Sequence, residues 1–217
     1  RVVHVGTQQR SGRHYRRAAD LVRGGHLGDL RHVHIRATRN VTPGFMTPVD
    51  EPPLSPEAWD MWLGPAPFVP LDARRGLYHF RWFWDYSGGQ TTNLLAHEID
   101  IVQWMTGAMP TRVAAFAQRL SLDGFGETPD AFEAIYEFPT FLLTWSNSEV
   151  SAGRVRGLEL SGTRGTLAIN RAGFEIIPDR AVPADQQIPS VTFAGGPPRE
   201  WPLRTDAVKD QGYEQVR

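Results

Sequence analysis

Residues 131–148 read AFEAIYEFPTFLLTWSNS. Two runs with strand-forming residues, Ala131–Phe138 and Phe141–Ser148, flank the short turn sequence Glu137-Phe-Pro-Thr140. This arrangement predicts an antiparallel hairpin, because parallel strands need a much longer crossover connection. The hairpin decides the fold class, since most of the chain after Pro110 repeats its pattern of strands and short turns.

Further strands are expected on both sides of this hairpin. They are Arg112–Arg119, Arg156–Ser161, Gly165–Asn170 and Gly173–Ile177. Consecutive strands with short connectors favour an antiparallel meander. After Pro178 the sequence predicts a loop as far as about Asp206.

The first half of the chain mixes helices and strands. The expected strands there are Val2–Val5 and Leu30–Thr38, the second because apolar and polar residues alternate along it. Helices are expected between Ser11 and Gly24, after an N-cap at Ser55, and from Gly88-Gly89 to Gly107. The proline-rich stretch from Val41 to Pro56 predicts a long loop. Mixed elements followed by a run of strands predict the α+β class, in a single domain over residues 1–217.

Composition limits the functions that are possible. The 23 basic residues are balanced by 24 acidic ones, whereas a nucleic-acid-binding protein needs a basic excess. No run of 18 apolar residues occurs, so the sequence predicts no membrane span. There is no cysteine, which excludes disulfides, thiolate metal ligands and cysteine nucleophiles. The single lysine is Lys209, so a catalytic lysine must be this residue or lie outside the chain.

The strongest group of candidate catalytic residues lies on the expected helix after Gly88-Gly89. Asn93 and His97 are four residues apart and would share one helix face, with Asp100 close to the same line. Histidine is a natural acid or base at neutral pH, and an amide one turn away can hold a substrate hydroxyl. The alternative interpretation is a capped helix with a buried, hydrogen-bonded histidine.

A second group lies in the polar segment between Gly6 and Ser11, where a strand would lead into a helix. Gln8, Gln9 and Arg10 offer hydrogen-bond donors there, and a helix N-terminus attracts anions. The alternative is a polar loop with a solvated arginine. No G-x-G-x-x-G dinucleotide motif and no phosphate-binding loop occur anywhere in the chain.

Two further patterns have both a functional and a structural interpretation. Trp82, Trp84 and Tyr86 could form apolar walls for a sugar ring, or could simply pack as a hydrophobic loop. His32 and His34 would share one strand face and could be two ligands of a metal ion, although no third ligand is evident.

Taken together, the motifs resemble a known family. In order they are VGTQQRS at 5–11, LVRGGHLG at 21–28, WLGPAP at 62–67, FRWFWDYSGG at 80–89, Asn93-x3-His97-x2-Asp100 and Trp104-x2-Gly107. The sequence resembles the C-terminal substrate and oligomerisation domain of the glucose–fructose oxidoreductase / inositol dehydrogenase / rhizopine-catabolism (Gfo/Idh/MocA) family over about residues 1–178.

The resemblance implies a large, mostly antiparallel sheet with helices on one face, and an open face that forms dimers or tetramers. It implies reversible hydride transfer between NAD or NADP and a secondary alcohol of a sugar or cyclitol. The cofactor would be bound mainly by an N-terminal Rossmann domain that ends in a Glu-Lys-Pro motif. Neither that motif nor a dinucleotide-binding sequence occurs in this chain, which is therefore expected to be part of a longer protein and inactive alone.

The resemblance also assigns roles to residues of this chain. His97 matches the usual acid/base, and Asn93 stands where the family commonly has an aspartate, so that its expected role is positioning. Gln8 and Arg10 match the segment that faces the nicotinamide and the substrate. Arg10 is also expected to contact substrate, as are three aromatic residues: Trp82, Trp84 and Tyr86.

Other interpretations are kept open by the sequence. One is a cofactor-free module that binds a sugar or assembles subunits, and a weaker one is a metal-dependent enzyme that uses His32 and His34. The expected partners are a small sugar or polyol and further copies of the chain, with no nucleic acid and no membrane. The expected location is the cytoplasm, unless an export signal precedes Arg1.

Overall fold

The computed structural model describes residues 2–3, 5–40, 54–72, 75, 79–120, 126–151, 157–194 and 208–209. Its strands are β1 (Leu30–Thr38), β2 (Arg112–Gln118), β3 (Ala131–Glu137), β4 (Leu142–Ser148), β5 (Gly157–Gly162), β6 (Gly165–Asn170), β7 (Gly173–Pro178), β8 (Val191–Ala194) and β9 (Val208–Lys209). Its α-helices are α1 (Arg13–Arg23), α2 (Pro56–Leu63) and α3 (Ala96–Thr106). Shorter helical turns are η1 (Gln8–Ser11), η3 (His79–Trp82) and the π-helical η4 (Thr91–Leu95).

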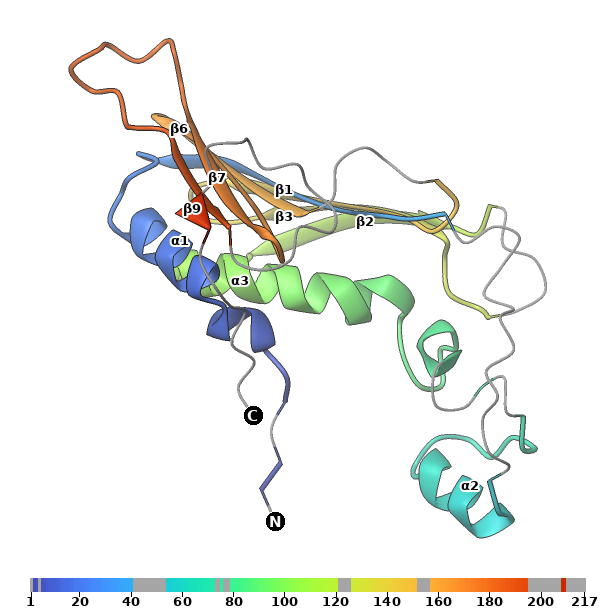
Figure 1. Ribbon diagram of the computed structural model, residues 1–217. Helices are drawn as coiled ribbons and strands as arrows, with labels where there is room; N and C mark the ends of the chain where they lie inside the picture. Colours follow the sequence, from blue (N-terminus) through green and yellow to red (C-terminus); the bar gives the residue numbers. More distant parts are fainter. Residues whose placement is uncertain are drawn as a thin grey trace.

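The strands form one sheet in the order β2-β3-β4-β1-β5-β6-β7-β8-β9. Figure 1 shows α1 and α3 side by side under one face of this sheet. All neighbouring pairs are antiparallel except β1–β4 and β8–β9. The α+β class and the mostly antiparallel sheet expected from the sequence are therefore confirmed.

Three expectations about the strands were wrong. The sheet is not a simple meander, because β1 lies between β4 and β5 and pairs with both. The region after Pro178 contains β8, although its proline-rich surroundings predicted a loop. Val2, Val3 and Val5 lie in no strand and are more than four-fifths exposed, since no neighbouring strand pairs with them.

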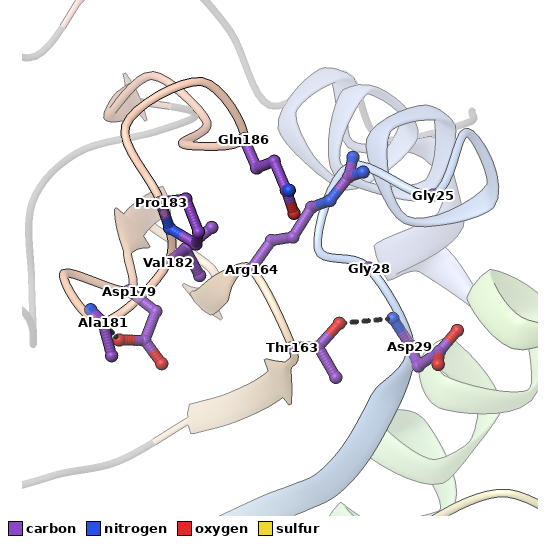
Figure 2. Close-up of a pocket in the computed structure, with 10 residues that line it drawn as sticks. All are labelled: Gly25, Gly28, Asp29, Thr163, Arg164, Asp179, Ala181, Val182, Pro183 and Gln186. Carbon is purple, nitrogen blue, oxygen red and sulfur yellow. Dashed lines mark hydrogen bonds between the residues drawn. The ribbon is translucent and has the colours of Figure 1, made fainter.

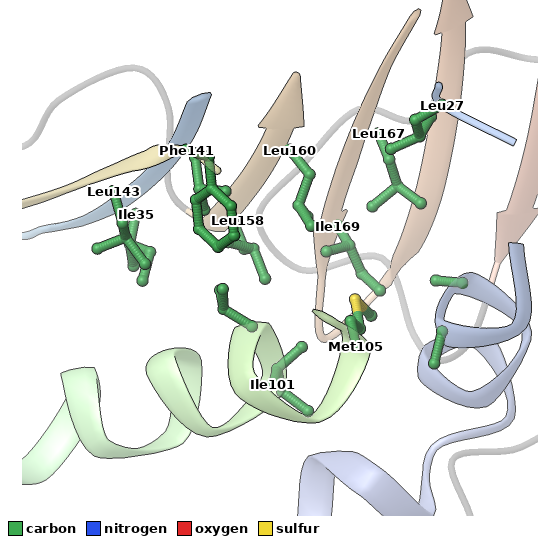
Figure 3. Packing of buried hydrophobic residues seen from close by; sticks show 14 of the residues in the cluster. Leu27, Ile35, Ile101, Met105, Phe141, Leu143, Leu158, Leu160, Leu167 and Ile169 are labelled. Carbon is green, nitrogen blue, oxygen red and sulfur yellow. The ribbon is translucent and has the colours of Figure 1, made fainter. Parts of the chain in front are cut away.

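The hydrophobic core lies between the sheet and α1 and α3. Along β1, Val33 and Ile35 are buried and face the helices, as the alternating pattern predicted. In Figure 3, Ile101 and Met105 of α3 extend toward the side chains of the sheet, among them Leu158 and Ile169. α3 ends at Gly107, whose positive φ of 69° fits the left-handed conformation that glycine adopts readily.

The opposite face of the sheet carries mainly polar side chains. His32, His34 and Arg36 of β1 lie on this face, because they alternate with the buried residues of the strand. A group of exposed apolar side chains interrupts the polar surface toward one edge: Phe116, Ile135 and Leu142. We call this side of the sheet the open face.

α2 lies away from the sheet, near the segment that precedes η4 (Figure 1). It begins as predicted, because the Ser55 hydroxyl accepts a hydrogen bond from the Ala58 amide over 3.1 Å and Pro56 follows at the first helical position. Most of the long loop predicted from Val41 onwards, residues 41–53, lies outside the described residues. Within the described part of the chain, no helix has both the length and the apolar character required to cross a membrane.

Candidate active site

His97 lies in the first turn of α3, directly after the π-helical turn η4. Its side chain is partly exposed, so a ligand can reach the imidazole. Partial burial lowers the pKa of His97, and the charge of Arg171 lowers it further, while Asp100 acts in the opposite direction. The imidazole is therefore mainly neutral near pH 7 and is able to accept a proton.

Asn93 lies in η4 rather than in a regular α-helix, so the simple four-residue spacing to His97 does not hold. Its amide is fixed by two other side chains. Arg81 Nε donates to Asn93 Oδ1 over 3.3 Å, and Asn93 Nδ2 donates to Gln90 Oε1 over 2.9 Å. Arg81 and Gln90 thus determine how the amide is oriented.

The helical turn η1, which contains Gln8 and Arg10, packs against α3. Arg10 forms a bidentate ion pair with Asp100, with distances of 2.8 Å from Nε and 2.5 Å from Nη2. The carboxylate of Asp100 raises the pKa of Arg10. This arrangement confirms neither role expected of Arg10, because its guanidinium is already paired with a carboxylate, whereas Gln8 is partly exposed beside it.

A buried polar contact lies behind this ion pair. Gln9 is 1% exposed, and its Nε2 donates to Tyr15 Oη over 2.8 Å and to Glu98 Oε1 over 3.3 Å. Glu98 as a whole is partly exposed, but its carboxylate oxygen Oε2 is buried. Burial raises the pKa of Glu98 to about 7, against the smaller opposing effects of Gln9 and Arg171.

Sequence reasoning missed Glu98, Arg81, Gln90 and Arg171. A signal for Glu98 exists, because it is the one acidic residue between Leu94 and Ile99 in an otherwise largely apolar stretch. Arg171 lies in the tight turn between β6 and β7, and only the tertiary structure brings it near α3.

The three aromatic residues proposed as walls have different surroundings. Trp82 is 3% exposed and packs under Arg39, whose guanidinium carbon is 5.4 Å from the ring centroid. Trp84 is 58% exposed. The Tyr86 ring lies 4.8 Å from that of Trp62, edge to face. The segment is a helical turn followed by a bend rather than a strand, so Trp82 and Trp84 do not share a face.

His32 and His34 lie together on the open face, with ring centroids 4.0 Å apart. His34 Nδ1 and Thr144 Oγ1 are 2.7 Å apart, at hydrogen-bonding distance. Burial lowers the pKa of His34, with further lowering by His32 and Arg36. In the part of the chain that the structure describes, no three His, Cys, Asp or Glu side chains are grouped to hold a metal ion. The metal-dependent interpretation thus receives no support.

A surface pocket lies at the other end of α1. Figure 2 shows its lining, which includes Gly25 and Gly28 after α1, Thr163 and Arg164 between β5 and β6, and Gln186. None of the candidate catalytic or substrate-binding residues lines this pocket. This pocket is therefore separate from the contacts that Arg10 makes with α3 and that Asn93 makes in η4.

Comparison with solved structures supports the fold. The inositol dehydrogenase homolog from Azotobacter vinelandii, complexed with NADH and myo-inositol, aligns with 93% of this chain at a TM-score of 0.56 and 18% identity. The aldose-aldose oxidoreductase from Caulobacter crescentus, complexed with glycerol, aligns with 92% at a TM-score of 0.55 and 18% identity. The super-repressor mutant of Gal80p from Saccharomyces cerevisiae aligns with 87% at a TM-score of 0.58 and 15% identity. The alignments cover 45%, 50% and 45% of those chains, so this chain spans about half of their length.

Comparison with sequences gives one match, to part of the chain. No curated protein sequence matches the chain. Residues 68–168 match the family model described as GFO/IDH/MocA C-terminal domain. This segment contains η4 with Asn93, α3 with His97 and Asp100, and the strands from β2 to β5. Residues 68–168 are therefore similar to the C-terminal domain of the GFO/IDH/MocA family.

Proposed function

We propose that this chain is the substrate-binding and oligomerisation part of an oxidoreductase that uses NAD or NADP and acts on a secondary alcohol of a sugar or cyclitol. The observation that carries the proposal is His97: a partly exposed imidazole with a lowered pKa, in the family's helix and beside η1. NADH and myo-inositol in the Azotobacter structure support the choice of cofactor and substrate class.

Few of the residues described here are available to bind a nicotinamide cofactor. Gln8 in η1 is partly exposed and could meet the nicotinamide, whereas Arg10 is already paired with Asp100. No dinucleotide-binding glycine motif occurs in the chain. The proposal therefore places most of the cofactor's binding residues in another part of a longer protein.

When bound, the oxidised nicotinamide would accept the hydride that leaves the carbinol carbon. The residues of this chain handle the proton and the orientation of the substrate. Neutral His97 accepts the hydroxyl proton as the carbonyl forms, and returns a proton to the oxygen in the reverse direction. Asn93, oriented by Arg81 and Gln90, offers an amide for a neighbouring hydroxyl. Trp84 and Tyr86 offer ring surface for the apolar face of the sugar.

The test is His97→Ala in the longest natural form of the protein that carries this chain. Turnover with NAD or NADP should fall by about 10²–10⁴, because a general base is lost, while calorimetry should show nicotinamide binding unchanged. His26→Ala, beyond the far end of α1, is the matched control and should keep its turnover. Turnover at the wild-type level in His97→Ala would overturn the assignment.

A second candidate function is a cofactor-free module that binds a sugar or assembles subunits. It is favoured by the exposed apolar side chains of the open face. Calorimetric titration of the longest natural form of the protein with NAD, NADP and a sugar panel separates the two, because only the oxidoreductase binds a nicotinamide. Assembly through the open face is proposed in either case. The cytoplasmic location expected from the sequence stays a prediction.

A further inference from the structure

Two buried oxygen atoms at the contact between η1 and α3 have no hydrogen-bond partner among the described residues: Gln9 Oε1 and Glu98 Oε2. Their side chains already meet, since Gln9 Nε2 donates to Glu98 Oε1 over 3.3 Å. Both hydrogens of this Nε2 are used, because it also donates to Tyr15 Oη. Buried acceptors without a donor are rare and costly. This contact therefore lacks one donor.

A proton on Glu98 would supply that donor. A carboxylate only accepts hydrogen bonds, whereas a carboxylic acid has one O–H that donates. With the proton on Oε2, Glu98 can donate to Gln9 Oε1 while it accepts from Gln9 Nε2. The acid and the amide then form a closed pair with two hydrogen bonds, and no charge is left in the buried contact.

The groups around Glu98 are compatible with a neutral acid. Arg171, from the turn between β6 and β7, favours the charged form, but burial outweighs it and raises the pKa to about 7. Asp100, on the same helix, has its charge balanced by Arg10. From α1, Tyr15 meets this contact through Gln9 Nε2, whereas His14 is buried beside Tyr15, with its Nε2 3.0 Å from the carbonyl oxygen of Asn170.

The contact has a defined place relative to His97. Successive residues of an α-helix are separated by about 100° around its axis, so His97 lies between Asp100 and Glu98 on the circumference of α3. η1 contacts Asp100 through Arg10 and Glu98 through Gln9. It therefore reaches across the side of the helix that carries His97, and its position affects what can approach the imidazole.

We propose that Glu98 is a positioning residue that works in its protonated form: as a neutral acid it pairs with Gln9 and holds η1 across the His97 side of α3. Loss of the Glu98 proton leaves a buried negative charge and breaks the pairing with Gln9, so that η1 is no longer held across the His97 side of α3. The consequence for catalysis rests on the proposed function, whereas the pairing itself does not.

The pairing is tested on the 217-residue chain, without substrate or cofactor. Infrared and carboxyl-carbon NMR titrations of the wild type should show one glutamic acid that keeps its proton at pH 6 and loses it near pH 7. Above that pH, hydrogen exchange of the η1 amides, corrected for its intrinsic pH dependence, should accelerate by up to about tenfold per pH unit. Glu98→Gln should lack the titration and keep slow exchange at pH 8–9, because its amide stays neutral.

Glu133→Gln is the matched control, because Glu133 is exposed on the open face and its Oε2 accepts a hydrogen bond from the Ser146 hydroxyl. This variant should retain the pH-dependent exchange of η1. A wild type whose glutamates all lose their protons below about pH 5.5 would overturn the proposal, and this result does not depend on the folding of any variant. Slow exchange at high pH in the wild type would also overturn it. The proposed function is tested separately by His97→Ala. The Glu98–Gln9 pairing and the proposed function can therefore each fail without the other.

Discussion

His97 and Glu98 are adjacent residues for which burial favours the neutral form, although it moves the two pKa values in opposite directions. Burial lowers the pKa of His97 and raises that of Glu98 to about 7. Arg171 acts on both, and it lowers both pKa values. At neutral pH the result is a histidine that can accept a proton beside a glutamic acid that holds one in part of the molecules.

The effect of Arg171 on His97 can be measured directly. Arg171→Gln removes a positive charge that disfavours the imidazolium, so the pKa of His97 should rise toward its ordinary value of about 6.5. It should remain below that value, because burial is the larger cause and is unchanged. NMR titration of the histidine ring signals measures the shift.

Arg180→Gln is the matched control, since Arg180 is exposed in the segment after β7. A His97 pKa that moves equally in both variants would show only a general charge effect. In the proposed enzyme, the alkaline plateau of alcohol oxidation should be lost as the pH falls through the pKa of His97. The Arg171→Gln profile should accordingly be displaced to higher pH.

At the scale of elements, η1 is joined to α3 by two contacts of different kinds. The Arg10–Asp100 pair is charged and partly exposed, with 41% and 20% of the two side chains accessible. The Gln9–Glu98 contact is buried and, when protonated, uncharged. Salt weakens the first and high pH weakens the second, so the position of η1 can be perturbed in two independent ways.

The charged contact should give a modest coupling energy. A double-mutant cycle with Arg10→Gln and Asp100→Asn should yield roughly 1 kcal/mol, because the pair is bidentate but partly solvated. Denaturant unfolding at about 0.05 M and about 0.5 M salt measures it, and the coupling should shrink at the higher ionic strength. Strict additivity of the two substitutions at low salt would contradict a stabilising pair.

At the scale of the whole molecule, the two faces of the sheet differ in what covers them. The helix-covered face holds the core and positions His97, whereas the open face carries Phe116, Ile135 and Leu142 in contact with solvent. These three side chains lie on adjacent strands, β2, β3 and β4. An apolar group of this kind on an otherwise polar face indicates an interaction surface.

Phe116→Glu should therefore abolish self-association of the chain without lowering its thermal stability, because Phe116 is 84% exposed and contributes little to the core. Sedimentation equilibrium measures the assembly, and thermal unfolding of the monomer measures the stability. Phe68→Glu is the control, as Phe68 is 76% exposed but lies outside the sheet. A wild type that stays monomeric at high concentration would contradict assembly through the open face.

The sequence predicted the elements better than their arrangement. β1, the three α-helices and the strands from β2 to β7 were predicted from local periodicity, capping and turn residues, which depend on neighbouring residues. The place of β1 inside the sheet could not be predicted, because strand pairing is decided by contacts between distant segments. Val2, Val3 and Val5 show the same limit: a β-branched run forms no strand without a neighbour.

The residues of the candidate site were likewise predicted from the sequence only in part. Asn93, His97 and Asp100 stand out in the sequence because they are polar residues at helical spacing. The partners that control them come from elsewhere: Arg81 from η3 for Asn93, Arg10 from η1 for Asp100 and Arg171 from a hairpin turn for His97. Sequence spacing within one helix cannot show such partners, since they are defined by tertiary packing.

The position of β1 has a consequence for the order in which the chain folds. β1 is synthesised first, yet both of its neighbours, β4 and β5, begin more than a hundred residues after its last residue. The hairpins from β2 to β4 and from β5 to β7 can form locally, but they join into one sheet only when β1 is inserted between them. Until then Val33 and Ile35 remain uncovered on the nascent chain. Closing so long a loop is slow, so we expect refolding to be limited by this insertion rather than by formation of the helices.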